Sequence, residues 1–131
     1  MKTNIKATSI GLTPAISDYI YSKLSHLDKI TKNFDDTMAD VEVGKSTNHH
    51  KSGDYFFAEI NLRMDGRVFH ETIDDENLYA AIDLVKDNME ENLVSYLKRK
   101  NTLVRRGGRA VKNFIKGLYT KKRDKNIGLL M

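Results

Sequence analysis

The chain has 131 residues, one proline, no cysteine and a formal net charge of +4. This length is typical of one domain that buries a core without disulfides or metal ions. The lack of cysteine excludes disulfide frameworks, zinc fingers and thiol catalysts, and it is compatible with a reducing cytoplasm. Because the first residues lack the apolar run of a secretory signal and no stretch approaches membrane-spanning length, we expect a cytoplasmic protein.

The first half of the sequence predicts a strand, a helix and a second strand. Loose alternation of polar and apolar residues predicts a strand over 2–10. Thr13 followed by Pro14 is typical of a helix start, and apolar residues at spacings of three and four extend this helix to about 31–33. The apolar stripe consists of Ile16, Ile20, Leu24, Leu27 and Ile30. A polar break then precedes a second strand over 39–43.

The second half predicts a hairpin followed by a long helix. Residues 55–64 alternate most clearly, and Asp65–Gly66 suits a type I′ turn that leads into a returning strand over 67–73. Asn77 is a favourable N-cap for a helix that we expect to reach about residue 100. Its apolar stripe consists of Leu78, Ile82, Val85, Met89, Leu93 and Tyr96.

The resulting βαβββα order predicts an α+β fold in which two helices pack on one face of a four-stranded, mostly antiparallel sheet. We expect this domain to span residues 1–101. Residues 102–131 would form a basic tail, and Gly107–Gly108 predicts a hinge within it. Beyond it, apolar residues at helical spacing alternate with Arg109, Lys112 and further lysines, which predicts a basic amphipathic helix.

Catalysis and metal binding are poorly supported by the residues. Adjacent histidines such as His49–His50 point apart in an extended chain, and no further ligand lies at suitable spacing. Three acidic pairs fall at element ends or on outward helix faces, where solvated charge or capping is a simpler interpretation than catalysis. These pairs are Asp35–Asp36, Asp74–Asp75 and Glu90–Glu91. No glycine-rich phosphate loop or nucleophile motif is present. We therefore expect no enzyme, catalytic residue, metal or cofactor.

The charge is divided unevenly along the chain. Residues 1–97 carry 10 Lys and Arg against 17 Asp and Glu, a net charge of −7, whereas residues 98–131 carry 12 against one, a net charge of +11. An acidic body with a basic tail favours a polyanionic partner, either nucleic acid or an anionic membrane. A tail that only improves solubility is the plain alternative.

Basic residues cluster around the end of the second predicted helix. The cluster consists of Lys98, Arg99, Lys100, Arg105, Arg106 and Arg109, with Lys112 following in the tail. Such a cluster can neutralise phosphates and gain free energy from counterion release without reading a base sequence. The aromatic residues of the body are better explained as packing residues than as stacking platforms for bases.

Three segments resemble the short form of the ribosome hibernation promoting factors, also called ribosome-associated inhibitors or sigma-54 modulation proteins. Leu12–Ile16 with Tyr19, Leu24, Leu27 and Lys29 is similar to the family's first-helix pattern. His49–Asp54 resembles its loop into the third strand, and Asn77–Asp83 resembles the start of its second helix. Together, in this order and on this βαβββα pattern, the matches are quite specific.

The resemblance implies a fold like a double-stranded-RNA-binding domain that occupies the mRNA and tRNA channel of the small ribosomal subunit. Such a protein would block translation under stress or in stationary phase, with ribosomal RNA as its partner and no small-molecule substrate. The resemblance assigns phosphate contacts to basic residues on the outward helix faces. We expect the protein to be a monomer. The positions that keep a basic residue are Lys23, Lys29, Lys86, Lys98, Arg99 and Lys100.

One departure from the family pattern concerns the exposed stripe of the second helix. The family usually has Lys or Arg where this chain has Asn88, Glu91 and Ser95. The basic tail is therefore either a compensating RNA anchor or a helix for another partner. Two other functions remain open at this point: regulation of a different structured RNA, and, less favoured, anchoring to an anionic membrane through the tail.

Overall fold

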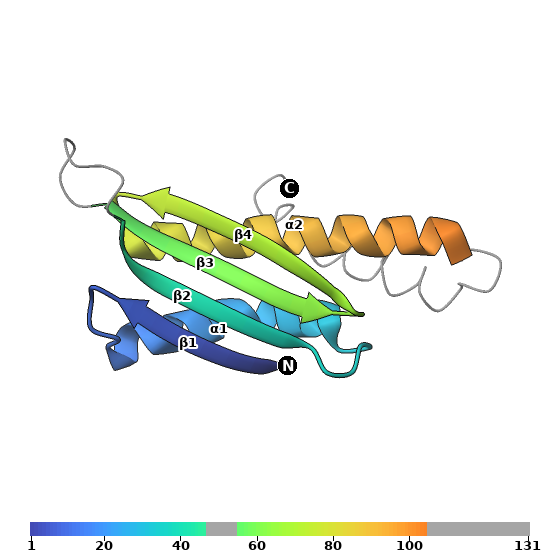
Figure 1. Ribbon diagram of the computed structural model, residues 1–131, viewed down its shortest axis with the longest axis horizontal. Helices are drawn as coiled ribbons and strands as arrows, with labels where there is room; N and C mark the ends of the chain where they lie inside the picture. Colours follow the sequence, from blue (N-terminus) through green and yellow to red (C-terminus); the bar gives the residue numbers. More distant parts are fainter. Residues whose placement is uncertain (47–54, 105–131) are drawn as a thin grey trace, which may run out of the picture. The chain divides into compact units, whose positions relative to one another are not determined.

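The computed structural model describes residues 1–46 and 55–104, and the chain divides into two compact units, 1–91 and 92–131. The elements follow the predicted βαβββα order (Figure 1). They are β1 (Lys2–Thr8), α1 (Pro14–Thr31), β2 (Met38–Ser46), β3 (Tyr55–Met64), β4 (Arg67–Asp75) and α2 (Leu78–Val104). The second unit, as far as it is described, consists of the last turns of α2. The predicted domain boundary after residue 101 stays a prediction.

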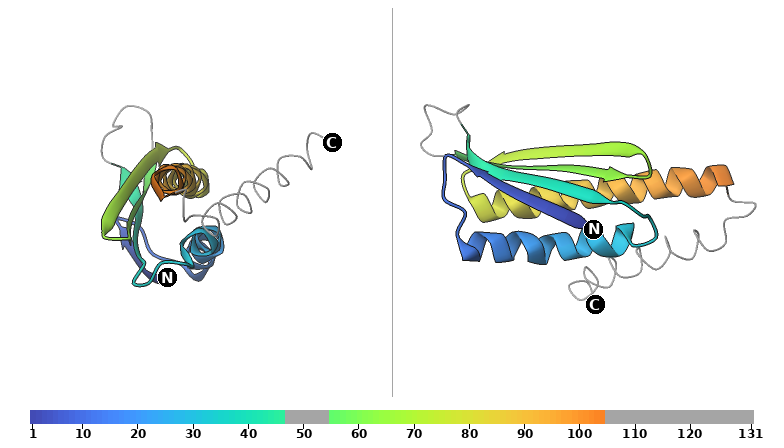
Figure 2. Two further views of the ribbon diagram at one scale, coloured as in Figure 1. Left: turned by 90° about the vertical axis from the view of Figure 1, so that its right-hand side faces the viewer. Right: turned by 60° about the horizontal axis from the view of Figure 1, so that its bottom comes forward.

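The four strands form one sheet in the order β1-β2-β3-β4. Strands β1 and β2 are parallel, and the other two pairs are antiparallel. Helix α1 connects the parallel pair, because parallel neighbours need a crossover. Both helices begin on the same face of the sheet and leave the other face open (Figure 2). The predicted fold class, with two helices on one face of a mostly antiparallel sheet, is confirmed.

The core of the first unit lies between the sheet and the two helices. Strand register brings Val41 of β2 opposite Ile60 of β3, so that alternate residues of the two strands bury the same face. The helices meet this face with the predicted apolar stripes. The stripe residues that are buried within the first unit are Ile20, Leu24, Leu27, Ile30, Leu78, Ile82, Val85 and Met89. Ile16, at the start of the first stripe, is only half-buried.

The ends of the elements have local causes. The side chain of Thr13 accepts a hydrogen bond from the Ile16 amide at 3.2 Å, and that of Asn77 accepts one from Ala80 at 3.1 Å, so both predicted N-caps are confirmed. Strand β1 ends at Thr8 rather than at the predicted residue 10, because Ser9 has a φ of 64° and cannot continue an extended strand.

The β3–β4 turn is the predicted two-residue hairpin. Asp65 and Gly66 have φ angles of 57° and 70°. Positive φ at both central residues is the requirement of a type I′ turn, whose twist matches that of the flanking strands. The turn fixes the register in which Leu62 lies opposite Phe69, with both side chains buried.

Gly44 of β2 leaves no room for a side chain beside β1. It lies opposite Thr8, and a Cβ atom at this position would overlap the Thr8 carbonyl oxygen and come within 2.8 Å of the Phe57 ring. We expect Gly44→Ala to lower the free energy of unfolding by about 1–3 kcal/mol, because the strands must separate to accept the methyl group.

Gly11 provides the matched control. A Cβ atom there would have no neighbour within 4 Å, so Gly11→Ala should change the free energy of unfolding by less than about 0.5 kcal/mol. Urea denaturation of both variants measures the difference. Equal stability of the two variants would contradict the close approach of β1 and β2.

Candidate nucleic-acid interface

The predicted RNA-binding lysines of α1 lie away from its buried stripe. Lys29 is exposed in the last turn, where a cation also interacts favourably with the helix dipole. Lys32, at the C-cap, is exposed as well and was not among the predicted contacts. Its spacing of three from Lys29 could have identified Lys32 as a further candidate contact, since residues three apart are neighbours on a helix surface.

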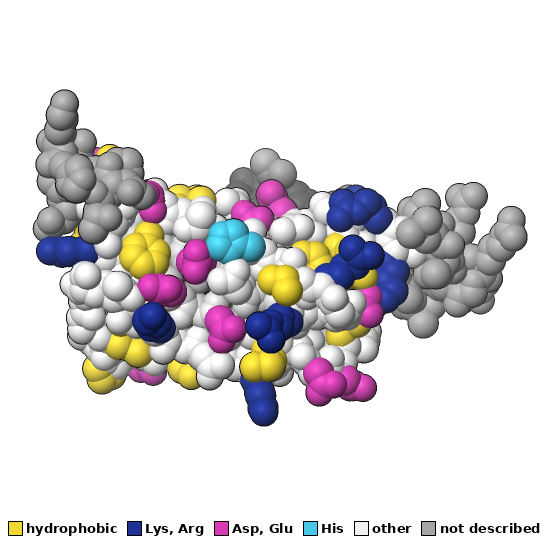
Figure 3. Space-filling view, in the orientation of Figure 1, with side chains coloured by type: hydrophobic (Ala, Val, Ile, Leu, Met, Phe, Trp, Pro, Cys, Tyr) yellow, Lys and Arg dark blue, Asp and Glu magenta, His cyan; other side chains and the backbone are white. Residues whose placement is uncertain are grey.

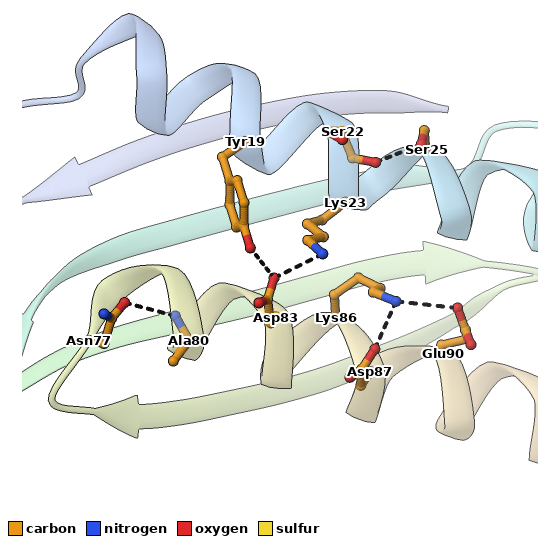
Figure 4. A network of polar contacts seen from close by, with 10 residues as sticks. All are labelled: Tyr19, Ser22, Lys23, Ser25, Asn77, Ala80, Asp83, Lys86, Asp87 and Glu90. Atoms are coloured by element: carbon orange, nitrogen blue, oxygen red, sulfur yellow. Dashed lines mark hydrogen bonds and ion pairs between the residues drawn. The ribbon is translucent and has the colours of Figure 1, made fainter. Parts of the chain in front are cut away.

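Lys23, the other predicted contact on α1, is engaged within the protein. Its Nζ lies 3.1 Å from Oδ1 of Asp83 on α2, and its side chain is 31% exposed. The hydroxyl of Tyr19 donates a hydrogen bond of 2.6 Å to the same oxygen (Figure 4). Nζ of Lys23 also lies 5.3 Å from the centre of the Tyr19 ring. One carboxylate oxygen of α2 therefore holds two side chains of α1.

Tyr19 contributes an aromatic contact to the same cluster. Its ring packs edge-on against Tyr79, with 4.8 Å between the ring centres. The hydrogen bond to Asp83, followed by burial and the negative charge of that carboxylate, raises the pKa of Tyr19 to about 12. The phenol therefore remains a hydrogen-bond donor to Asp83 throughout the neutral range.

This pKa shift has a consequence for stability at high pH. The folded pKa of Tyr19 is about 12 and the ordinary value is 10.0, so its contribution to folding is fully present below pH 10 and is lost as the pH rises toward 12. We expect the free energy of unfolding to fall less steeply with pH in Tyr19→Phe, which lacks the titrating group. Urea titrations at several pH values in this window measure both slopes, and equal slopes would contradict the hydrogen bond.

Lys86 is buried among carboxylates of its own helix. The residue is 8% exposed, and its Nζ lies 2.7 Å from Oδ1 of Asp87 and 3.7 Å from Oε1 of Glu90. The contact with Glu90 is an i,i+4 pair of the kind that stabilises helices. RNA contact by Lys86 stays a prediction, and it would require the ammonium group to leave both carboxylates.

The remaining predicted contacts belong to the second unit. Lys98 and Arg99 are exposed near the end of α2, and Lys100 is half-buried. Arg105, Arg106, Arg109 and Lys112 lie outside the described residues, as does the predicted tail helix. The interface predicted from the sequence is thus divided between two units, with Lys23, Lys29 and Lys86 in the first and Lys98–Lys100 in the second.

The residues that depart from the family pattern also occupy outward or half-buried positions of α2. Glu91 and Ser95 are exposed, and Asn88 is half-buried. Each takes a position where the resemblance led us to expect a cation. The middle of α2 therefore carries less positive charge than the pattern implies. Nearer the start of α2, Asp83 engages Lys23 of α1.

The open face of the sheet has a different character from the helices. Acidic and basic side chains are interspersed over it (Figure 3). Between β3 and the edge strand β4, Nδ1 of His70 lies 2.6 Å from Oδ1 of Asn61, and Nε2 lies 3.8 Å from a carboxylate oxygen of Glu59. Within residues 1–46 and 55–104, no three His, Asp or Glu side chains are grouped so that they could hold a metal ion. His49 and His50 lie outside the described residues.

None of the helices in the described part of the chain is long and apolar enough to cross a membrane.

The fold belongs to a known structural class. It is similar to the N-terminal domain of Protein Y from Thermus thermophilus, with a TM-score of 0.58, 29% identity and coverage of 71% of this chain and 96% of that domain. A ribosomal subunit interface protein from Coxiella burnetii has the same fold, with a TM-score of 0.58 and 14% identity over 73% of this chain and 97% of that chain.

Sequence comparison defines the family. Residues 3–101 match the family described as sigma 54 modulation protein / S30EA ribosomal protein, and the chain belongs to this family. A ribosome hibernation promotion factor of Picosynechococcus is 38% identical over 102 residues, covering 77% of this chain and 51% of that protein. A ribosome hibernation promoting factor of Klebsiella oxytoca is 26% identical over 73% of this chain and 93% of its own length. The chain thus spans about half of the first relative and nearly all of the second.

Proposed function

We propose that this protein is a ribosome hibernation factor that binds the small ribosomal subunit and occupies the channel used by mRNA and tRNA. The observation that carries the proposal is the family match over residues 3–101, which includes almost the entire βαβββα fold. Translation would be blocked under stress or in stationary phase by occupation of the site. The protein would act in the cytoplasm with ribosomal RNA as its main contact.

The charge distribution supports binding through phosphates. Lys29 on α1 and Lys98 and Arg99 on α2 carry exposed cations, and such residues gain free energy when they displace counterions from RNA. The acidic residues of the body oppose contact with RNA elsewhere on its surface. We infer that orientation on the ribosome depends on the ends of the helices more than on the middle of α2.

A competition experiment tests occupation of the channel. Small subunits are loaded with mRNA and tRNA before the full chain is added, and bound protein is measured after pelleting. We expect loaded subunits to bind much less protein than empty ones. Simultaneous binding of the protein and both RNAs would contradict the channel site while leaving open another site on the ribosome.

A further inference from the structure

The cluster that joins α1 and α2 engages a cation that could otherwise bind RNA. Oδ1 of Asp83 lies 2.6 Å from the Tyr19 hydroxyl oxygen and 3.1 Å from Nζ of Lys23 (Figure 4). The side chains of Lys23 and Asp83 are 31% and 40% exposed. The pair is therefore accessible from solvent, and in the unbound protein the ammonium group of Lys23 is paired with a carboxylate that Tyr19 also contacts.

Because the ion pair between Lys23 and Asp83 is exposed to solvent, little free energy is needed to break it. Ion pairs with this much exposure contribute little to stability, because water solvates both partners well. A phosphate group can compete with such a carboxylate for the ammonium. Lys86 differs in this respect, because its side chain is only 10% exposed and it contacts two carboxylates.

We propose that Asp83 attenuates RNA binding by holding Lys23 against α2, so that RNA must displace this carboxylate before Lys23 can contact a phosphate. The inference rests on the proposed function. It assigns to Asp83 the role of a positioning residue that makes binding weaker and release easier. Removing the carboxylate should therefore strengthen RNA binding.

Asp83→Asn is the informative substitution. Asparagine keeps the shape and one oxygen acceptor for the Tyr19 hydroxyl but removes the charge that holds Lys23. We expect the full-length variant to bind small ribosomal subunits about two- to fivefold more tightly near 0.1 M salt. The salt dependence of binding should steepen by up to about 0.7–0.9, the value of one additional phosphate contact.

Two controls separate release of Lys23 from a general loss of negative charge. Asp18→Asn removes an exposed carboxylate from α1 and should leave the affinity nearly unchanged. In a Lys23→Met background, Asp83→Asn should give no gain, since the cation that it releases is absent. An equal gain in this background, an equal gain from Asp18→Asn, or weaker binding by Asp83→Asn would each overturn the proposal.

A second probe keeps this test independent of the ribosome. The same variants are titrated with a short RNA duplex, after thermal melting has shown that each is folded. If the wild-type chain does not bind small subunits at low salt, the proposed function fails. The gain of Asp83→Asn and its dependence on Lys23 are then decided by the duplex measurements alone.

Discussion

Replacing Lys98, Arg99 and Lys100 together by glutamine should weaken binding to the small ribosomal subunit on the order of 100-fold near 0.1 M salt. The physical reason is counterion release, since each lost phosphate contact lowers the salt slope by about 0.7–0.9 and three contacts lower it by about 2–3. Two of these side chains are exposed and one is half-buried at the end of α2. Salt titrations of subunit binding by the variant and the wild type measure both effects.

A variant with the same change in charge controls for long-range electrostatics. Lys2, Lys6 and Lys45 are exposed on β1 and β2, and their joint replacement by glutamine removes three positive charges from the sheet. We expect at most a few-fold loss of affinity. If the sheet variant binds as weakly as the helix variant, net charge determines affinity and the assigned contacts on α2 are wrong.

Leu27→Ala should lower the free energy of unfolding by about 2–5 kcal/mol, the cost of lost burial and of the cavity that remains. Leu27 is fully buried in the layer between α1 and the sheet. The loss is a large share of the stability of an ordinary domain, which is about 5–15 kcal/mol in total. Urea denaturation of the full chain measures it.

Leu84 offers the same chemical change at a solvent-facing position. Its side chain is 44% exposed on α2, so Leu84→Ala should change the free energy of unfolding by less than about 0.5 kcal/mol. Similar losses from the two substitutions would show that Leu27 is not part of the core between α1 and the sheet.

The sequence was sufficient to predict the order and type of the elements because their signals are local. The Thr13 and Asn77 caps and the Asp65–Gly66 turn each depend on residues within one helical turn or one hairpin. Element ends that depend on distant partners were less accurate. Strand β2 runs to Ser46, beyond the predicted residue 43, because it continues to pair with β3 as far as Tyr55.

The ion pairs formed by the candidate RNA-binding lysines also differ in whether they depend on local or distant residues. The pair between Lys86 and Glu90 follows from i,i+4 spacing and could have been inferred from the sequence. The pair between Lys23 and Asp83 joins residues on different helices, so it depends on how α1 and α2 pack. Spacing along the chain carries no signal for such a contact, and the attenuating role proposed for Asp83 could be reached only from the fold.

Co-sedimentation with separated ribosomal subunits shows whether the protein binds the small subunit. The full-length chain is mixed at low salt with purified small or large subunits, pelleted, and then washed with increasing salt. We expect the protein to pellet with the small subunit and to be released as the salt concentration rises. Failure to pellet with the small subunit, or equal pelleting with the large one, would contradict the proposed function.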